Sequence, residues 1–289
     1  MTTIACLGGI SKTKLIKMKS SVEALLDQYE KYKLSEVIDY DKFNSYAIVH
    51  HSSSIEGSTL NEVETRLLLD ENLTPKGKPL EHTLMTKDHF AALLYILQEA
   101  KSKPPISPEF IQKINAQVMK STGGIYNTVL GTIDASKGMF RKGNVSAGGT
   151  YFVNFDKVES LIKELCDNLN HRLASAGSKL DNLEISFIAH FHLVTIHPFY
   201  DGNGRTSRLL MNYIQKISDL PLSPVYKEDK ADYFTALQDT RQHEDTNIFK
   251  DFMYSQYEKY LKGEIRKYQE ILPENDKNQN WGSGYSMMF

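Results

Sequence analysis

The chain has 289 residues, of which 40% are hydrophobic and 24% are charged, a composition typical of a globular protein with one large or two modest domains. Its formal net charge of −2 excludes a global positive field for nucleic acid or anionic membranes, so any polyanion must be held by local positive groups. The two cysteines, Cys6 and Cys166, exclude a disulfide framework, and no apolar stretch approaches the ~18 residues of a membrane span. We therefore expect a reducing, cytoplasmic location, with no nucleic-acid and no membrane partner.

Helical periodicity is the dominant pattern along the chain. Apolar residues recur at three- and four-residue steps, which lines them up along one face of a helix. In chain order, these stripes predict helices within residues 15–29, 90–97, 110–119, 158–169, 183–196, 209–217 and 248–261. Prolines 104, 105 and 108, and prolines 221 and 224, mark two of the joins. The polar segment 273–289 is expected to be loose.

One segment breaks the helical pattern. Residues 144–147 and 150–153 flank Gly148 and Gly149, which predicts two short strands around a tight turn. A single small hairpin in a helical chain cannot form a core sheet, so it is either decoration or a working flap. The sequence therefore predicts an all-α fold that carries one short β-hairpin and an N-terminal helical extension.

The most informative segment lies between two apolar helical stripes and ends where the second helix begins. Its residues are His197, Pro198, Phe199, Tyr200, Asp201, Gly202, Asn203, Gly204, Arg205, Thr206, Ser207 and Arg208. The first backbone N–H groups of a helix have no partner within it and point outward at the positive end of the dipole. This location predicts a phosphate-binding site that needs no net positive charge on the protein.

Four residues of this segment suit a polyphosphate. Gly202 and Gly204 carry no Cβ, so a phosphate can approach the backbone closely. Arg205 and Arg208 are three residues apart, which allows both guanidinium groups to lie on one helix face. Each of these features alone is more often structural, and only their combination within twelve residues favours a functional site.

Three further side chains complete the chemistry. Asp201 offers a hard oxygen ligand for Mg²⁺, which phosphates also coordinate. His197 has a pKa near neutrality and can accept a proton from an attacking hydroxyl group. Phe199 lies between polar neighbours, so we interpret it as an anchor in the core.

At every fixed position the twelve residues resemble the signature of the Fic family, His-x-Phe-x-Asp/Glu-Gly-Asn-Gly-Arg-x-x-Arg. The resemblance implies three regions: N-terminal helices over 1–100 with an inhibitory helix near 41–56, a Fic core over 101–220, and C-terminal helices and a tail over 221–289. It also implies the activity of a protein adenylyltransferase, which transfers AMP from ATP to a Tyr, Ser or Thr hydroxyl of a target protein.

The resemblance assigns a role to each residue of the segment. It implies His197 as the general base, Asp201 as the Mg²⁺ ligand, Gly202, Asn203 and Gly204 as the anion hole, and Arg205 and Arg208 as contacts to the β- and γ-phosphates. It implies that the flap aligns a target segment by main-chain pairing; we assign the flap to 143–153, with Gly143, Asn144, Val145, Ser146, Ala147, Gly148, Gly149 and Thr150 as docking residues. Relatives that act as kinases carry a larger residue in place of Gly204, so the glycine favours AMP transfer.

A second, weaker motif lies upstream. Ser52, Glu56 and Gly57 match the family's inhibitory pattern Ser/Thr-x-x-x-Glu-Gly/Asn, although such a pattern also marks an ordinary helix end with Gly57 as the stop residue. The resemblance implies that Glu56 pairs with Arg208 and removes the clamp on the γ-phosphate. The same glutamate is a candidate for positioning a water molecule that removes AMP.

Several alternatives stay open at this point. The chain is either an enzyme, a regulatory protein that binds nucleotide without turnover, or a Fic enzyme that uses another donor. Its partners are ATP and a hydroxyl-bearing target protein of unknown identity, and a homodimer is left open. The remaining histidines and aromatic residues are interpreted as packing or polar-loop residues, namely His50, His51, His190, His192, His243, Tyr233 and Phe234.

Overall fold

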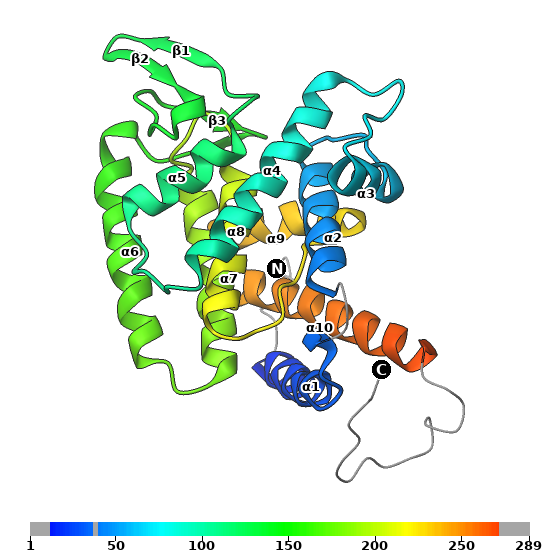
Figure 1. Ribbon diagram of the computed structural model, residues 1–289. Coiled ribbons are helices and arrows are strands. Elements are labelled where there is room, and N and C mark those ends of the chain that lie inside the picture. Colours follow the sequence, from blue (N-terminus) through cyan, green and yellow to red (C-terminus); the bar gives the residue numbers. More distant parts are fainter. Residues whose placement is uncertain (1–11, 37–39, 272–289) are drawn as a thin grey trace, which may run out of the picture.

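The computed structural model describes residues 12–36 and 40–271, and Figure 1 shows a helical protein with two small hairpins at one end. Its helices are α1 (Lys12–Lys31), α2 (Tyr40–Ile55), α3 (Glu62–Glu71), α4 (Leu80–Glu99), α5 (Pro108–Val118), α6 (Val158–Ser175), α7 (Lys179–Ile196), α8 (Asn203–Ile217), α9 (Lys230–His243) and α10 (Thr246–Ile271). Its strands are β1 (Ile125–Thr128), β2 (Gly131–Asp134), β3 (Ser146–Ala147) and β4 (Thr150–Tyr151). Cys6 and the segment 273–289, for which the sequence analysis made predictions, lie outside the described residues. Among the described helices, none combines the length and the apolar character that a membrane crossing requires.

Side-chain caps fix where several helices begin. Asn61 accepts a hydrogen bond from the Glu64 amide and receives the Glu64 side chain on its own amide, which closes a capping box at α3. Ser107 caps α5 by accepting a hydrogen bond from the Phe110 amide at 3.2 Å, with Pro108 as the first helical residue. Ser178 caps α7 through the amide of Asp181. These local signals position the helices that carry the site.

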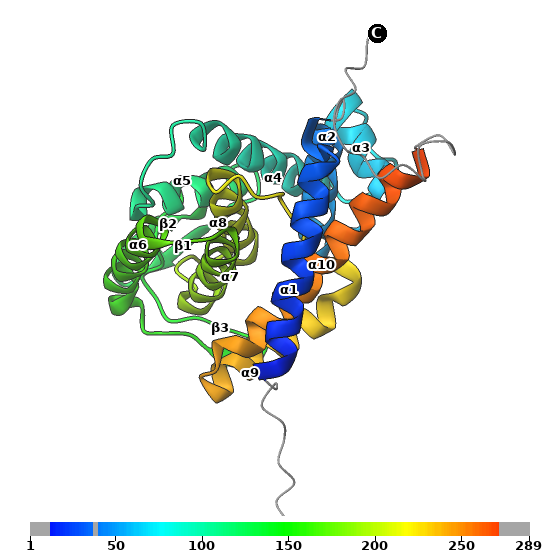
Figure 2. The same cartoon turned by 90° about the horizontal axis from the view of Figure 1, so that it is seen from below.

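Two hydrophobic cores meet at α7. Residues Ile185, Ala189, Leu193 and Ile196 of α7 pack into a core with α4, α5, α6 and α8. Residues Leu183, Phe187, Phe191 and Val194 of the same helix pack into a second core with α1, α9 and α10. Figure 2 shows α1 running beside α10 on one side of the molecule, with α5 to α8 gathered on the other. The apolar character of α7 on most of its faces therefore reflects its place between two cores.

The predicted fold class is confirmed: the chain is helical, with N-terminal helices, a helical core and a hairpin at the predicted flap. Cys166 is 2% exposed, and burial raises the pKa of its thiol to about 12. One count was wrong, because the described residues contain a second hairpin, β1–β2, in register Ile125↔Asp134 to Thr128↔Gly131. Its two-residue loop is Val129-Leu130 rather than a glycine- or asparagine-rich pair, so the usual turn signal is missing.

Candidate active site

The loop from α7 to α8 is held in a single conformation by its own residues. His197 ends α7 in the left-handed region with φ of 54°, and its amide donates to the Leu193 carbonyl at 3.0 Å. Phe199 is 1% exposed and packs in the core, as predicted. The Asn203 side chain bridges back to Phe199, accepting from its amide at 3.0 Å and donating to its carbonyl at 2.9 Å. The predicted anion-hole residue Asn203 therefore uses its side chain to hold the loop, and only its backbone N–H is left for an anion.

The N-terminus of α8 offers free backbone donors. Gly202 precedes the helix with φ of 77°, and no side chain caps the helix at this position. The first internal helical bond runs from the Thr206 amide to the Gly202 carbonyl at 2.9 Å. The preceding amides of the first turn thus point out of the helix at its positive end, as an anion site requires.

The two motif glycines are required by close neighbours. A Cβ at Gly202 would lie 2.8 Å from both Asn115 Nδ2 and Met119 Sδ, so packing on α5, together with the positive φ, explains this glycine. A Cβ at Gly204 would collide with Glu56 Oε1. Gly204 therefore makes room for the glutamate, which is a reason that the sequence alone did not give.

Arg205 lies in the wall of the site. It is 3% exposed and donates to the Val118 carbonyl at 3.4 Å and to Met119 Sδ at 3.2 Å. Its Nη2 lies 3.8 Å from Asp201 Oδ1. Burial lowers the pKa of Arg205 below its usual range, and its Nε has no hydrogen-bond partner among the described residues. A buried cation with an unpaired donor is suited to receive an anionic ligand.

Arg208 contacts the segment that the second motif predicted. Its Nε donates to Ser52 Oγ at 2.8 Å, and its Nη2 donates to the Ser52 carbonyl at 3.2 Å. The same Nη2 lies 2.5 Å from Glu56 Oε1, across 152 sequence positions. Tyr233 is buried near this arginine, and its hydroxyl lies 2.9 Å from Nε2 of His190.

The Glu56–Arg208 pair is electrostatically coupled. Burial alone would raise the pKa of Glu56, but the charge of Arg208 and the hydrogen bond from it lower the pKa below its usual value. Burial would lower the pKa of Arg208, and Glu56 reverses that shift, so the pKa of Arg208 is raised. Both groups are therefore charged at neutral pH. Gly57, with φ of 104°, turns the chain away just after α2 and leaves Glu56 facing α8.

His197 lies beneath the flap. The Phe152 ring stacks on the imidazole with a centroid distance of 3.8 Å and an interplanar angle of 13°. Burial lowers the pKa of His197 to about 4, so the ring is neutral at pH 7. Its Nδ1 lies 3.4 Å from the Val194 carbonyl oxygen. A proton held on Nδ1 by that carbonyl would leave the lone pair of Nε2 free to accept another.

The flap itself is exposed. Ser146 pairs with Tyr151 and Ala147 with Thr150, around Gly148 and Gly149, which both have positive φ. The Phe152 amide donates to the Val145 carbonyl at 3.3 Å and extends the pairing by one residue on each side. This is the geometry of a primed two-residue turn, which the glycine pair predicts.

Four side chains of the site were given no role by the sequence, although one of them, Phe152, lies within the predicted flap. Arg141 contacts both ends of the flap and the loop at His197. Asn115 donates to the Asp201 carbonyl and to Thr206 Oγ1, each at 3.1 Å. Tyr126 of the second hairpin stacks on Tyr200, with centroids 4.3 Å apart. Phe152 covers the histidine. All four lie outside the motif in sequence. The glycine pair predicts the strand that contains Phe152, but no local pattern predicts its contact with His197 or marks the other three.

The histidines and aromatic residues outside the motif are packed in the core or lie among polar groups. His190 is fully buried beside Tyr233 and Phe249, and Phe234 is 48% exposed. His51 Nδ1 accepts from the Lys227 amide at 3.3 Å. Across the described ranges, no group of three His, Cys, Asp or Glu side chains could hold a metal ion without help from a ligand.

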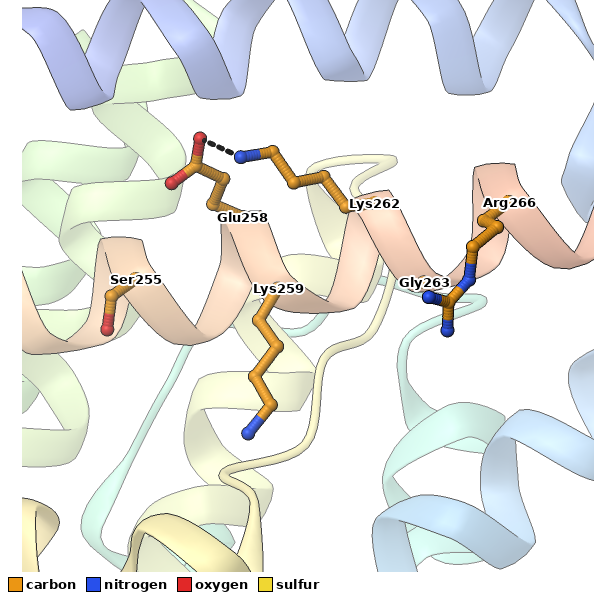
Figure 3. Close-up of a pocket in the computed structure, with 6 residues that line it drawn as sticks. All are labelled: Ser255, Glu258, Lys259, Lys262, Gly263 and Arg266. Carbon is orange, nitrogen blue, oxygen red and sulfur yellow. Dashed lines mark ion pairs between the residues drawn. The ribbon is translucent and has the colours of Figure 1, made fainter.

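A separate surface hollow lies on α10. Figure 3 shows it on α10, with a volume of about 450 Å³, lined by Ser255, Glu258, Lys259, Lys262, Gly263 and Arg266. Its cations are already paired, Lys262 with Glu258 at 2.8 Å and Lys259 with Asp229 at 2.7 Å. All of its lining residues belong to α10, and none of them is part of the α7–α8 loop, so this hollow is separate from the candidate active site.

Known proteins resemble this arrangement. A model of the Fic/DOC family matches residues 105–215, which include the flap and the α7–α8 loop. The chain is 31% identical over 224 residues to protein adenylyltransferase fic-1 of Caenorhabditis elegans, covering 76% of this chain and 42% of that protein. It is 30% identical over 191 residues to protein adenylyltransferase Fic of Drosophila willistoni, covering 66% of this chain and 36% of that protein.

A solved structure of Fic-1 from C. elegans, residues 134–508, superposes with a TM-score of 0.71 at 25% identity, covering 89% of this chain and 74% of that one. Relative to the two full-length adenylyltransferases above, the chain spans less than half of their length.

Proposed function

The chain belongs to the Fic/DOC family, and on that premise we propose that it is a protein adenylyltransferase, which transfers AMP from ATP to a hydroxyl group of a target protein. The observation that carries the proposal is the start of α8, where free amides, Arg205 and Arg208 converge next to a neutral histidine. The names of the relatives support the same activity.

In this proposal the reaction is an in-line displacement at the α-phosphorus of ATP. His197 accepts the proton of the target hydroxyl, and the hydroxyl oxygen bonds to the α-phosphorus. The bond between the α-phosphorus and the oxygen that bridges it to the β-phosphate breaks, and pyrophosphate leaves. The amides at the start of α8 and Arg205 stabilise the phosphates, and Arg208 orients the γ-phosphate. Of the predicted anion-hole residues, Asn203 and Gly204 contribute through their free amides, whereas the Gly202 amide already donates to Asp201. Catalysis is then largely positioning and charge stabilisation.

Asp201 fits the role of a Mg²⁺ ligand within this proposal. Its side chain is 59% exposed at the mouth of the site, next to Arg205, and one of its oxygens accepts from the Gly202 amide at 2.5 Å. A single carboxylate suits Mg²⁺, which binds one or two protein ligands together with phosphates. When bound there with ATP, the ion would supply positive charge against the charge that develops on the leaving pyrophosphate.

We also propose that Glu56 restrains the enzyme. The glutamate pairs with Nη2 of Arg208, and Ser52 accepts from Nε and Nη2, so these two donors would be lost to the γ-phosphate; Nη1 has no partner among the described residues. The close approach of Glu56 to Gly204 supports this role, because the carboxylate lies over the backbone that the phosphates would contact. Removal of AMP by the same glutamate stays a prediction.

The flap between residues 143 and 153 is proposed to dock the target segment. Its strands are two residues long and exposed, so their free backbone groups can pair with an added strand. A cytoplasmic location stays a prediction from the sequence. A homodimer, a nucleotide-binding role without turnover and a different donor stay alternatives that the sequence leaves open, and the sequence does not identify the target.

The test compares the wild-type protein with Glu56→Gly and Glu56→Gly/His197→Ala variants. Each is incubated with Mg²⁺ and ATP labelled at either the α- or the γ-phosphate, and label on protein is measured. We expect Glu56→Gly to transfer α-label only, and the double variant to transfer none. Transfer of γ-label would instead identify a kinase, and binding of ATP without any transfer would favour the regulatory protein.

A further inference from the structure

Arg141 is a buried cation that has no carboxylate partner among the described residues. It lies between β2 and the flap and is 2% exposed. All the hydrogen bonds of its side chain go to backbone carbonyl oxygens. Burial lowers the pKa of its guanidinium group, because no anion compensates the lost hydration. Burying a charge in this way costs free energy, which the hydrogen bonds of the guanidinium group must offset. These hydrogen bonds therefore indicate the role of Arg141.

The contacts of Arg141 join three separate points of the chain. Its Nη1 donates to the Gly143 carbonyl at 2.9 Å, where the flap begins, and its Nη2 donates to the Val153 carbonyl at 2.5 Å, where the flap ends. Its Nε donates to the carbonyl of His197 at 2.8 Å. The Arg141 amide adds a bond to the Pro198 carbonyl at 2.9 Å. One residue thus ties both ends of the flap to the residue proposed as the general base.

We propose that Arg141 is a positioning residue that sets the height and register of the flap above His197. This inference rests on the proposed function. If a target segment pairs with the exposed flap strands, the distance from the flap to the imidazole decides whether the target hydroxyl reaches it. The planar guanidinium fork fixes that distance from three directions, which the point charge of a lysine cannot do.

Two neighbouring contacts support this reading. The Phe152 ring, next to Val153, stacks on the His197 imidazole, so the flap already contacts the proposed general base. Asn144 Oδ1 accepts from the Phe155 amide at 3.0 Å, which closes the base of the flap from the outside. Arg141 contacts neither the amides at the start of α8 nor the Glu56–Arg208 pair. Its effect should therefore fall on transfer and spare nucleotide binding.

The test places Arg141→Lys in the Glu56→Gly protein, with Arg266→Lys as the matched control. Arg266 is exposed on α10 and pairs only with Glu270, at 3.8 Å, among the described residues. Three quantities are measured: hydrogen exchange of the Phe152 amide, affinity for a non-hydrolysable ATP analogue with Mg²⁺, and transfer of α-label from varied ATP to lysate proteins. If Arg141→Lys does not fold, Arg141→Gln, which removes the charge, replaces it.

We expect faster exchange in the flap, a maximal transfer rate reduced at least ~10-fold, and a KM for ATP and an analogue affinity changed less than ~3-fold. Arg266→Lys should change none of them. Unchanged exchange, unchanged transfer, or a parallel fall of transfer and analogue affinity would each overturn the assignment. If the Glu56→Gly parent itself transfers nothing, the proposed function fails instead, and the exchange of the flap amide alone decides whether Arg141 holds the flap.

Discussion

Two regions meet at His197 and are held by different kinds of contact. On the nucleotide side, Arg205 and Arg208 of α8 are at most 3% exposed, and Arg208 is fixed by a charged pair and by Ser52. On the target side, the flap is exposed, with Tyr151 at 88%, and is tied down only at its base. The nucleotide side is thus preorganised, whereas the target side leaves the backbone groups at the edges of its strands free.

This difference follows from what each region has to bind. A polyphosphate has one shape and a large charge, so buried, oriented donors suit it. A target segment contributes its own backbone, so a short strand with free edges suits it. Substitutions on the nucleotide side should therefore alter ATP binding or its restraint, and substitutions on the target side should alter transfer alone.

The largest effect is expected at the residue that the two regions share. In the Glu56→Gly protein, His197→Ala should reduce transfer of α-label about 10³-fold, because no other described group near the acceptor position is placed to take its proton. ATP affinity should stay within a few-fold, since the ring makes no contact with Arg205 or Arg208. The measurement is transfer rate beside equilibrium binding of an ATP analogue. A parallel loss of binding would place His197 on the nucleotide side and break the comparison.

The nucleotide side was largely predictable because its residues are close in sequence. The motif from His197 to Arg208 lies on one loop and one helix turn, and its two flanking helices are marked by strong apolar stripes. Glu56 was predicted to pair with Arg208 from a family pattern that begins at Ser52, and the structure places all three together. Nothing in the spacing of 152 positions could have given that contact.

The target side was predicted less completely, for physical reasons. The Gly148-Gly149 turn gave the flap its signal, because both residues need positive φ. The second hairpin turns at apolar residues and gave none. Arg141 was visible only as a residue next to the flap, since a buried arginine that binds carbonyl groups has no sequence pattern. Its role depends on tertiary contacts with His197 and Val153.

The second-largest effect concerns pH and the burial of His197. Its pKa is lowered to about 4 by burial, against about 6.5 in an unfolded chain. Between these values the unfolded state binds more protons, so the contribution of His197 is fully present above pH 6.5 and is lost as pH falls towards 4. We expect the free energy of unfolding of the wild type to fall by up to ~3 kcal/mol more than that of His197→Gln between pH 7 and pH 4.

Denaturant unfolding of both proteins at several pH values measures this difference. The acid limb of the transfer rate in Glu56→Gly should likewise lie well below pH 6.5, since a neutral imidazole is needed to accept the proton. Equal pH dependence in the two proteins would mean that the flap does not bury the ring. The target side would then be more open than the stacked Phe152 indicates.

A smaller effect, with a change of sign, is expected at Gly204. In the wild type, Gly204→Ala should destabilise the protein by ~1–3 kcal/mol, because the new Cβ collides with Glu56 Oε1. In the Glu56→Gly background the collision is absent, and alanine in place of glycine in a helix should stabilise by up to ~1 kcal/mol. Unfolding free energies of the four proteins form a double-mutant cycle. Additive effects would show that Glu56 does not occupy the space over α8.

The smallest effect is expected at the second hairpin, which tests how far the target side extends. Tyr126 stacks on Tyr200 of the active-site loop at 4.3 Å, and burial together with Asp201 raises the pKa of its hydroxyl. Loss of this stacking in Tyr126→Ala should cost ~1 kcal/mol of stability and lower transfer only a few-fold, with unchanged affinity for the ATP analogue. Both substitutions are made in the Glu56→Gly protein. Tyr126→Phe keeps the ring and should match that parent protein in stability, transfer and affinity for the analogue. A loss of ATP affinity in Tyr126→Ala would show that this hairpin supports the phosphate loop, because Tyr200 is followed directly by Asp201, and would assign it to the nucleotide side.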